Sequence, residues 1–232
     1  MKTITAASAS VACFVFASLL GGCGASMQAR SVDLKNSLLV DPSILKKGTG
    51  GDSLYYYVSP KVGATRHPKI MIDPVLILKQ GQLDAGDREN CQKLADNAYV
   101  YLTQELQRDY QIVQAPEPGT LRYQLAIIDA DNSNPVTNIL SSITPSGIGV
   151  SLVKYGFTGK LTGVGEITCE VKVTDAMTGE LLGAALDRRV GGKDLNGVFD
   201  TWSHADAALK YWVQRSRYTF CVARGGTGCV KP

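Results

Sequence analysis

Apolar and polar residues alternate most regularly between residues 166 and 190. Over 166–174 the apolar side chains occupy every second position, which predicts a strand with one buried face. The turn sequence of residues 175–180 and the small, mostly apolar segment over 181–190 predict that this strand continues into a hairpin. Residues 121–127 alternate in the same way and predict a further half-buried strand.

Three more segments have clear patterns. A near-continuous apolar run over 69–78 predicts a strand covered on both faces, with Pro74 at a bulge or an edge. Apolar residues recur at helical spacing from Asp87, a candidate N-cap, to about residue 109. A second helix, over 200–220, has one apolar stripe and cations near its end, where they suit the helix dipole. This order of elements predicts an α+β fold, loosely α/β, in which a mixed sheet carries both long helices on one face.

Residues 132–165 have the least regular pattern, with a short helix expected near 135–142 and six glycines after it. Long irregular loops inside compact domains are uncommon and are often functional. The glycine-rich stretch 143–165 is therefore a candidate binding segment for a small molecule or a glycan. A plain connection without a ligand is the alternative.

The N-terminal segment has one cation, Lys2, and an apolar run of about ten residues that ends in Leu20-Gly21-Gly22-Cys23. This run is shorter than the roughly 20 residues that a transmembrane helix needs. The four closing residues resemble the lipobox of bacterial lipoproteins, which implies cleavage before Cys23 and acylation of its thiol and its new amine. An ordinary secretory signal is the alternative. Gly24, and not an aspartate, follows the cysteine, and by the same resemblance this favours the periplasmic face of the outer membrane.

We divide the chain into a signal peptide at 1–22, a tether at 23–66, an α+β domain at 67–220 and a tail at 221–232. Scattered Gly, Ser, Lys and Asp indicate the tether, in which the aromatic run 54–58 either packs along the domain surface or forms an exposed patch. The net charge of +3 is well mixed along the chain and gives no sign of a nucleic-acid partner.

The last two cysteines predict a disulfide. Cys221 and Cys229 flank seven residues rich in glycine, and such a segment turns tightly enough to bring two cysteines together. An exported protein meets an oxidising compartment, which favours the bond. Reduced thiols or a metal pair are the alternatives, but no histidine lies nearby to complete a zinc set.

Two further cysteines lie on apolar faces of predicted elements. Cys91 belongs to the apolar stripe of the first helix, and Cys169 belongs to the apolar face of the strand at 166–174. A disulfide between helix and sheet fits this placement, and so do two buried thiols.

The chemistry-bearing residues form no recognisable catalytic pattern. His67 and His204 are the two histidines of the sequence, and neither lies beside a nucleophile in the chain. Asp129, Asp131 and Asp175 do not have the spacing of a calcium loop. We therefore predict a protein that is not an enzyme and that has no metal site and no cofactor.

Three other clusters have a functional and a structural interpretation. Ser146 lacks the flanking glycines of a nucleophile elbow. Gly163-Val164-Gly165 is too short for a dinucleotide fingerprint. Asp187-Arg188-Arg189 is either an anion site or a salt-bridged strand end, and we favour the strand end.

Several stretches of the chain resemble the DUF3313 family of bacterial lipoproteins, namely the residues at 37–45, 72–75, 118–122, 175–180 and 187–189. Their order and spacing carry the resemblance, which implies a location and a continuous fold but supplies no catalytic residues. We expect a lipid-anchored, non-enzymatic protein at the periplasmic face of the outer membrane that contacts another envelope protein. A module that binds a small molecule or a glycan through 143–165 is the alternative.

Overall fold

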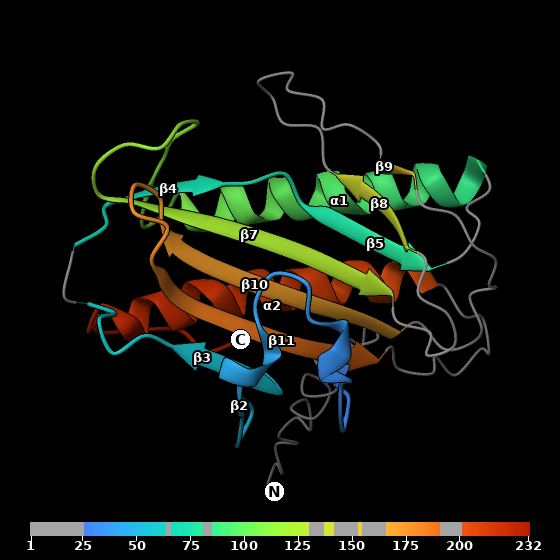
Figure 1. The fold of residues 1–232 in the computed structure, drawn as a ribbon, viewed down its shortest axis with the longest axis horizontal. Helices are drawn as coiled ribbons and strands as arrows, with labels where there is room; N and C mark the ends of the chain where they lie inside the picture. Colours follow the sequence, from blue (N-terminus) through green and yellow to red (C-terminus); the bar gives the residue numbers. More distant parts are fainter. Residues whose placement is uncertain are drawn as a thin grey trace, which may run out of the picture.

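The computed structural model describes residues 26–63, 66–80, 85–129, 137–141, 153–154, 166–190 and 201–232. This described part is one mixed sheet of eleven strands with two long helices, α1 (Ala85–Leu106) and α2 (Thr201–Ala223). The strands are β1 (Met27–Gln28), β2 (Lys46–Lys47), β3 (Tyr55–Val58), β4 (Lys69–Ile72), β5 (Leu76–Gln80), β6 (Gln111–Ile112), β7 (Thr120–Asp129), β8 (Thr137–Ser141), β9 (Val153–Lys154), β10 (Glu166–Asp175) and β11 (Leu181–Val190). Both helices lie behind the sheet in Figure 1, which confirms the predicted α+β fold.

The three longest strands form the centre of the sheet. Its order is β2-β3-β11-β10-β7-β5-β8-β9, with β1 also paired to β11 and with β4 paired to β6 and β7. Both β4 and β5 run parallel to β7, and β4 runs parallel to β6, whereas the other pairs are antiparallel. The hairpin predicted over 166–190 is the β10–β11 pair, whose two strands are joined by a short turn.

Some elements differ from the predicted ones. The apolar run at 69–78 is two strands, β4 and β5, because Pro74 lies between them and has no N–H for the ladder. Helix α1 begins at Ala85, so Asp87 lies in its first turn and does not precede the helix as a cap. The helix expected near 135–142 is wrong, since β8 occupies most of that range and pairs with β5.

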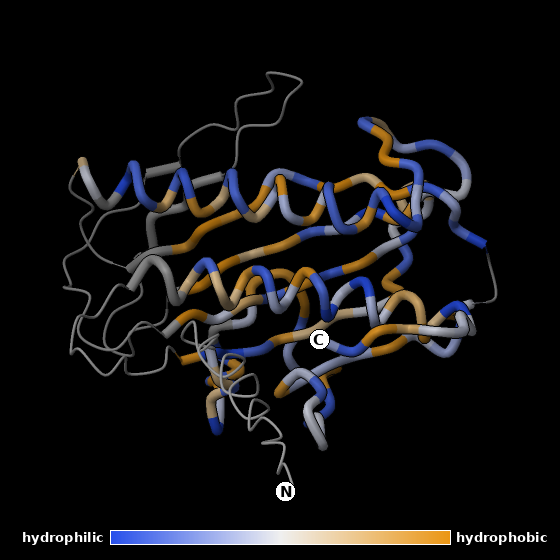
Figure 2. The backbone as a smooth tube through the Cα atoms, turned by 180° about the vertical axis from the view of Figure 1, so that it is seen from behind, coloured by the Kyte–Doolittle hydropathy of each residue, from blue (hydrophilic) through white to orange (hydrophobic). Residues whose placement is uncertain are grey.

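The main core lies between the helices and the sheet. Helix α1 packs over β4, β5 and β8, and α2 packs over β10. The buried side of each helix is the apolar stripe that the sequence predicts, so orange and blue alternate along both helices in Figure 2. Neither α1 nor α2 has an apolar stretch long enough to cross a bilayer.

The N-terminal segment covers the opposite face of the sheet. It runs in front of β10 and β11 in Figure 1, and its leucines pack against a second apolar cluster that contains Leu78, Ala126 and Leu186. Strands β1, β2 and β3 of this segment join the sheet beside β11. Residues 26–63, which the sequence assigns to a tether, are therefore part of the folded domain, because the sheet has a second apolar face for them to bury.

Glu170 of β10 holds the N-terminal segment on this face. Its carboxylate is fully buried and accepts hydrogen bonds from the Ser37 hydroxyl at 2.7 Å and from the backbone N–H groups of Leu38, Leu39 and Val40 at 2.6, 3.1 and 3.3 Å. Convergent backbone N–H groups of this kind form a nest for an anion. The strand alternation places Glu170 on the polar face of β10, and the structure shows that this face is covered.

Candidate functional site

A cavity of about 990 Å³ lies between the C-terminal half of α2 and strands β3, β10 and β11. The residues that line it come from four parts of the chain, within 52–68, 108–123, 169–185 and 212–224. The fold thus brings together one edge of the sheet, the end of α2 and the loops beside them.

The cavity exists because β11 has small residues where β10 has larger ones. Val171 and Val173 of β10 lie opposite Ala185 and Gly183 of β11, and residues opposite one another in a ladder point to the same face. The valines pack against the main core, whereas glycine and alanine leave the space beside them open. A Cβ atom at Gly183 would have the Tyr57 carbonyl oxygen, at 3.6 Å, as its nearest contact, so this position has room for a side chain.

Aromatic side chains form the inner wall. Phe220 lies edge-on to Tyr123 and to Tyr110, with ring centroids 6.0 and 5.9 Å apart. The Tyr123 hydroxyl is hydrogen-bonded to the Ser216 hydroxyl at 2.8 Å, and burial raises the pKa of Tyr123. The wall is therefore an apolar surface with its one phenol already engaged by α2.

Arg215 of α2 supplies a different kind of group to the cavity. Its Nη2 donates to Oδ1 of Asp52 at 2.7 Å, and its guanidinium carbon lies 5.1 Å from the centroid of the Tyr218 ring. Its Nη1 is buried and has no hydrogen-bond partner. A buried donor without an acceptor costs about 1–3 kcal/mol, so this nitrogen is a place where an acceptor on a ligand would bind.

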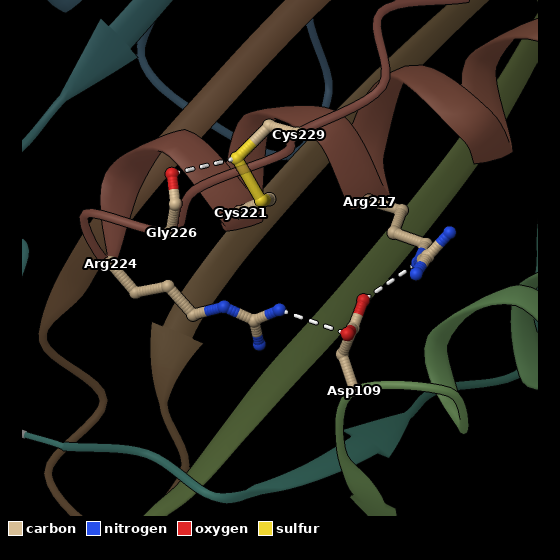
Figure 3. Close-up of a disulfide and its surroundings, with 6 residues drawn as sticks. All are labelled: Asp109, Arg217, Cys221, Arg224, Gly226 and Cys229. Atoms are coloured by element: carbon tan, nitrogen blue, oxygen red, sulfur yellow. Dashed lines mark hydrogen bonds and ion pairs between the residues drawn. A yellow bond between two sulfur atoms is a disulfide. The ribbon is translucent and has the colours of Figure 1, made fainter.

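Asp109 orders the end of the cavity near the C-terminal tail. Its carboxylate accepts from Arg217 at 2.6 Å and from Arg224 at 3.0 Å, as Figure 3 shows. Burial alone would raise the pKa of Asp109, but the hydrogen bonds from the two guanidinium groups outweigh it and lower this pKa. In the same view the predicted disulfide joins Cys221 and Cys229, with their Cα atoms 5.7 Å apart. The disulfide and the two ion pairs therefore fix the last turns of α2 beside the cavity.

His67 is engaged at the turn that links β10 to β11. Its Nε2 lies 3.0 Å from Oδ2 of Asp175, while Oδ1 of Asp175 accepts from the backbone N–H groups of Met177 and Thr178. The Thr178 N–H and the His67 ring lower the pKa of Asp175 to about 2. This pair closes a turn, and the structure places no hydroxyl or thiol nucleophile in contact with either residue except Thr178, whose hydroxyl also donates to Asp175.

The cluster at 187–189 is a structural strand end. Asp187 is buried and accepts from the Trp212 indole at 2.8 Å, from Gln28 Nε2 at 2.7 Å and from the Leu54 backbone at 3.2 Å. Arg189 lies flat on the Tyr211 ring, 3.6 Å from its centroid. These side chains join the N-terminal segment to α2, so they do not offer an open anion site.

Cys91 and Cys169 are both buried thiols and not a disulfide. The two residues belong to different layers of the core, since α1 packs over β4, β5 and β8 whereas β10 packs under α2. Burial, together with the carboxylates of Asp187 and Glu170, raises the pKa of Cys169 well above its usual value. The Cys169 thiol therefore stays protonated at neutral pH and is a poor nucleophile.

Other predicted sites fall partly or wholly outside the described residues. Cys23 and the whole signal peptide do so, and of the candidate binding segment 143–165 only β9 is described. His204 is described only as part of the backbone of α2. Within the described ranges, no three His, Cys, Asp or Glu side chains lie close enough together to hold a metal ion.

Sequence reasoning missed the cavity. Its floor is the small-residue stretch of β11, which the sequence shows only as apolar, and its cation, Arg215, shows only as part of a helix end. A run of Gly183, Ala184 and Ala185 opposite valines is the one signal that would have pointed to a hollow in the sheet.

Comparisons with known proteins identify a family and two structures of similar fold. The dodecameric PelC from Paraburkholderia phytofirmans is 9% identical, over 74% of this chain and 95% of that chain, with a TM-score of 0.35. A DUF4136 family protein from Bacteroides thetaiotaomicron is 11% identical, over 68% of this chain and 92% of that chain, with a TM-score of 0.32. None of the proteins of curated function matches the sequence. The sequence model described as "Protein of unknown function (DUF3313)" matches residues 35–216, which is most of the chain, and the protein therefore belongs to the DUF3313 family.

Proposed function

We propose that this protein is a lipid-anchored envelope protein that acts by binding and not by catalysis. Its place would be the periplasmic face of the outer membrane, with the acyl chains on Cys23. The lipobox-like Leu20-Gly21-Gly22-Cys23 supports the anchor. The observation that carries the proposal further is the position of Ser26, the first described residue after this motif.

Ser26 is docked on the sheet only three residues after Cys23. It is buried, and Arg189 donates from Nε to its hydroxyl at 2.9 Å and from Nη2 to its carbonyl oxygen. Three residues span at most about 10 Å. An acylated Cys23 would therefore hold this edge of the domain against the bilayer, whereas the tether expected from the sequence would allow a reach of roughly 35 Å.

A partner of such a protein would be met close to the membrane surface. Another envelope protein remains the partner that we propose, because a domain fixed at its N-terminal edge presents its other edges sideways and away from the bilayer. The cavity favours a second binding role, for a small molecule, and it would be open to ligands of the same compartment.

The anchor is tested by replacing the cysteine. Cys23→Ser should move the protein from the membrane fraction to the soluble fraction, and the mass of the native N-terminal peptide should lose its acyl chains. Cys13→Ser is the matched control, since Cys13 lies in the segment that would be removed and its loss should change neither result. A Cys23→Ser protein that stays in the membrane fraction would contradict lipid anchoring.

The orientation is tested with a photo-crosslinking residue at two exposed methionines. Met27, which is 61% exposed, lies beside the anchor, and Met177, which is 56% exposed, lies in the turn at the other end of β11. The nine steps from Leu181 to Val190 separate these ends by about 30 Å. Position 27 should crosslink to lipid and position 177 should not. Equal lipid crosslinking at both positions would mean that the domain is not held at its N-terminal edge.

A further inference from the structure

We propose that the cavity beneath α2 binds a single-chain amphiphile with an acidic head group. The head would accept a hydrogen bond from Nη1 of Arg215, and the chain would lie along the apolar wall formed by α2 and β10. This inference names the ligand class for the binding role proposed above, but it does not depend on the lipid anchor.

The head group is inferred from Arg215. The side chain is 12% exposed, its Nη2 is paired with Asp52, and its buried Nη1 has no partner. A guanidinium offers donors in one plane, which suits the paired oxygens of a carboxylate, a sulfate or a phosphate. Asp52 is 46% exposed and occupies only one side of this plane, so the inner side is left for a ligand.

The charge of the lining supports an acidic ligand. Its described cations outnumber its carboxylates by five to two, the cations being Lys61, Arg66, Arg108, Arg215 and Arg224 and the carboxylates Asp52 and Asp109. Both carboxylates are already hydrogen-bonded to guanidinium groups. A cationic head would therefore meet an excess of like charge, whereas an anionic head would relieve it.

The body of the ligand is inferred from the wall. Apart from its charged residues, the cavity is lined by aliphatic and aromatic side chains, which include Val171, Val173, Leu182, Trp212 and Phe220. Its volume of about 990 Å³ lies in the range of sites that enclose drug-sized molecules. The lining offers few polar groups away from Arg215, so a sugar or a peptide would leave its hydrogen bonds unmade. An alkyl chain makes no such demand.

The direct test is titration calorimetry with four ligands of equal chain length. The protein is the mature chain, residues 23–232 with Cys23→Ser, which keeps every described residue and removes the acylation site. Dodecanoate and dodecyl phosphate should bind, and comparing them distinguishes a carboxylate from a phosphate head. Dodecanol should bind about 10- to 100-fold more weakly, because a hydrogen bond to a charged group contributes roughly 1.5–3 kcal/mol. Dodecylammonium should bind no better than dodecanol.

Two variants separate the head from the body of the ligand. Arg215→Met should weaken dodecanoate binding about 10- to 100-fold and leave dodecanol unchanged. Arg122→Met is its matched control, because Arg122 is also paired with an aspartate, at 2.8 Å from Asp73, but lies outside the cavity. Gly183→Leu places a side chain in the open space and should abolish binding of all four ligands while circular dichroism keeps its wild-type form.

The outcomes decide between the alternatives. Equal affinity for dodecanoate and dodecanol, or an unchanged affinity in Arg215→Met, would overturn the acidic head. Unchanged binding in Gly183→Leu, or no binding to the wild-type chain, would overturn the cavity as the site. Because this protein has no acyl chains, a negative result leaves the membrane anchor untouched, and a failure of Cys23 acylation in cells leaves this inference untouched.

Discussion

Replacing Glu170 removes the acceptor that holds the N-terminal segment against the sheet. In Glu170→Ala three backbone N–H groups lose their partner, while Ser37 keeps its second hydrogen bond, to the Val40 carbonyl at 2.8 Å. Each buried donor left without an acceptor costs about 1–3 kcal/mol. The segment can detach and hydrate, so the losses do not add up in full, and we expect the free energy of unfolding to fall by about 3–5 kcal/mol.

Glu170→Gln should cost much less. An amide oxygen in place of Oε2 keeps the bonds from Leu38 and Leu39, and the amide nitrogen then faces the Ser37 hydroxyl, which can rotate and accept. Only the bond from Val40, the longest of the four at 3.3 Å, is lost together with the charge. We expect a loss of about 1–2 kcal/mol.

Urea unfolding and amide hydrogen exchange measure these effects. The amides of residues 38–40 should exchange faster in Glu170→Ala than in the wild type, and those of α1 should change less. Glu117→Gln is the control, since Glu117 is 41% exposed, pairs with Lys69 at the surface and should change stability by no more than about 0.5 kcal/mol. An alanine variant that is as stable as this control, with unchanged exchange at 38–40, would refute the role of the buried carboxylate.

Three more changes test other parts of the structure. Asp175 has a lower pKa in the folded state, so its carboxylate adds stability that is present above its ordinary pKa of 3.8 and is lost as the pH falls towards 2. Urea unfolding should find Asp175→Asn less stable than the wild type by about 1–2 kcal/mol at pH 7, with a difference that shrinks between pH 4 and pH 2. Reducing the bond between Cys221 and Cys229 should lower the free energy of unfolding by about 1–3 kcal/mol, and an identical Tm with and without reductant would contradict this. Gly226→Ala would place a Cβ atom 2.8 Å from the Cys221 sulfur, so mass labelling of thiols should find less disulfide after air oxidation.

The sequence predicted the central elements well because their patterns are local. The alternation in β7, β10 and β11 and the stripes of α1 and α2 depend on which residues face one core, and neighbours in the chain already encode that. The disulfide was equally local, since Cys221 and Cys229 are joined by a short glycine-rich segment. These parts of the fold needed no knowledge of distant contacts.

The rest depends on pairs that are far apart in the chain. Glu170 appears in the sequence as one polar residue of an alternating strand, and only its contact with residues 37–40 shows that the face is covered. The cavity likewise arises because Gly183 lies opposite Val173 and beside β3. Arg215 and Asp52, which meet there, are 163 positions apart, so no window of the sequence contains both.

The pairing of β1 with β11 also has a consequence for how the protein matures. Ser26 meets Arg189 across 163 residues, so the beginning of the chain has no place to dock until almost all of it has been exported. Native contacts of such high separation form late and slow the folding of a domain. Until then the apolar front of the sheet stays uncovered, and a chaperone that shields exposed strands would be needed during this interval. Acylation next to a still unfolded polypeptide would come first, and completion of the sheet would then draw the domain down onto the bilayer.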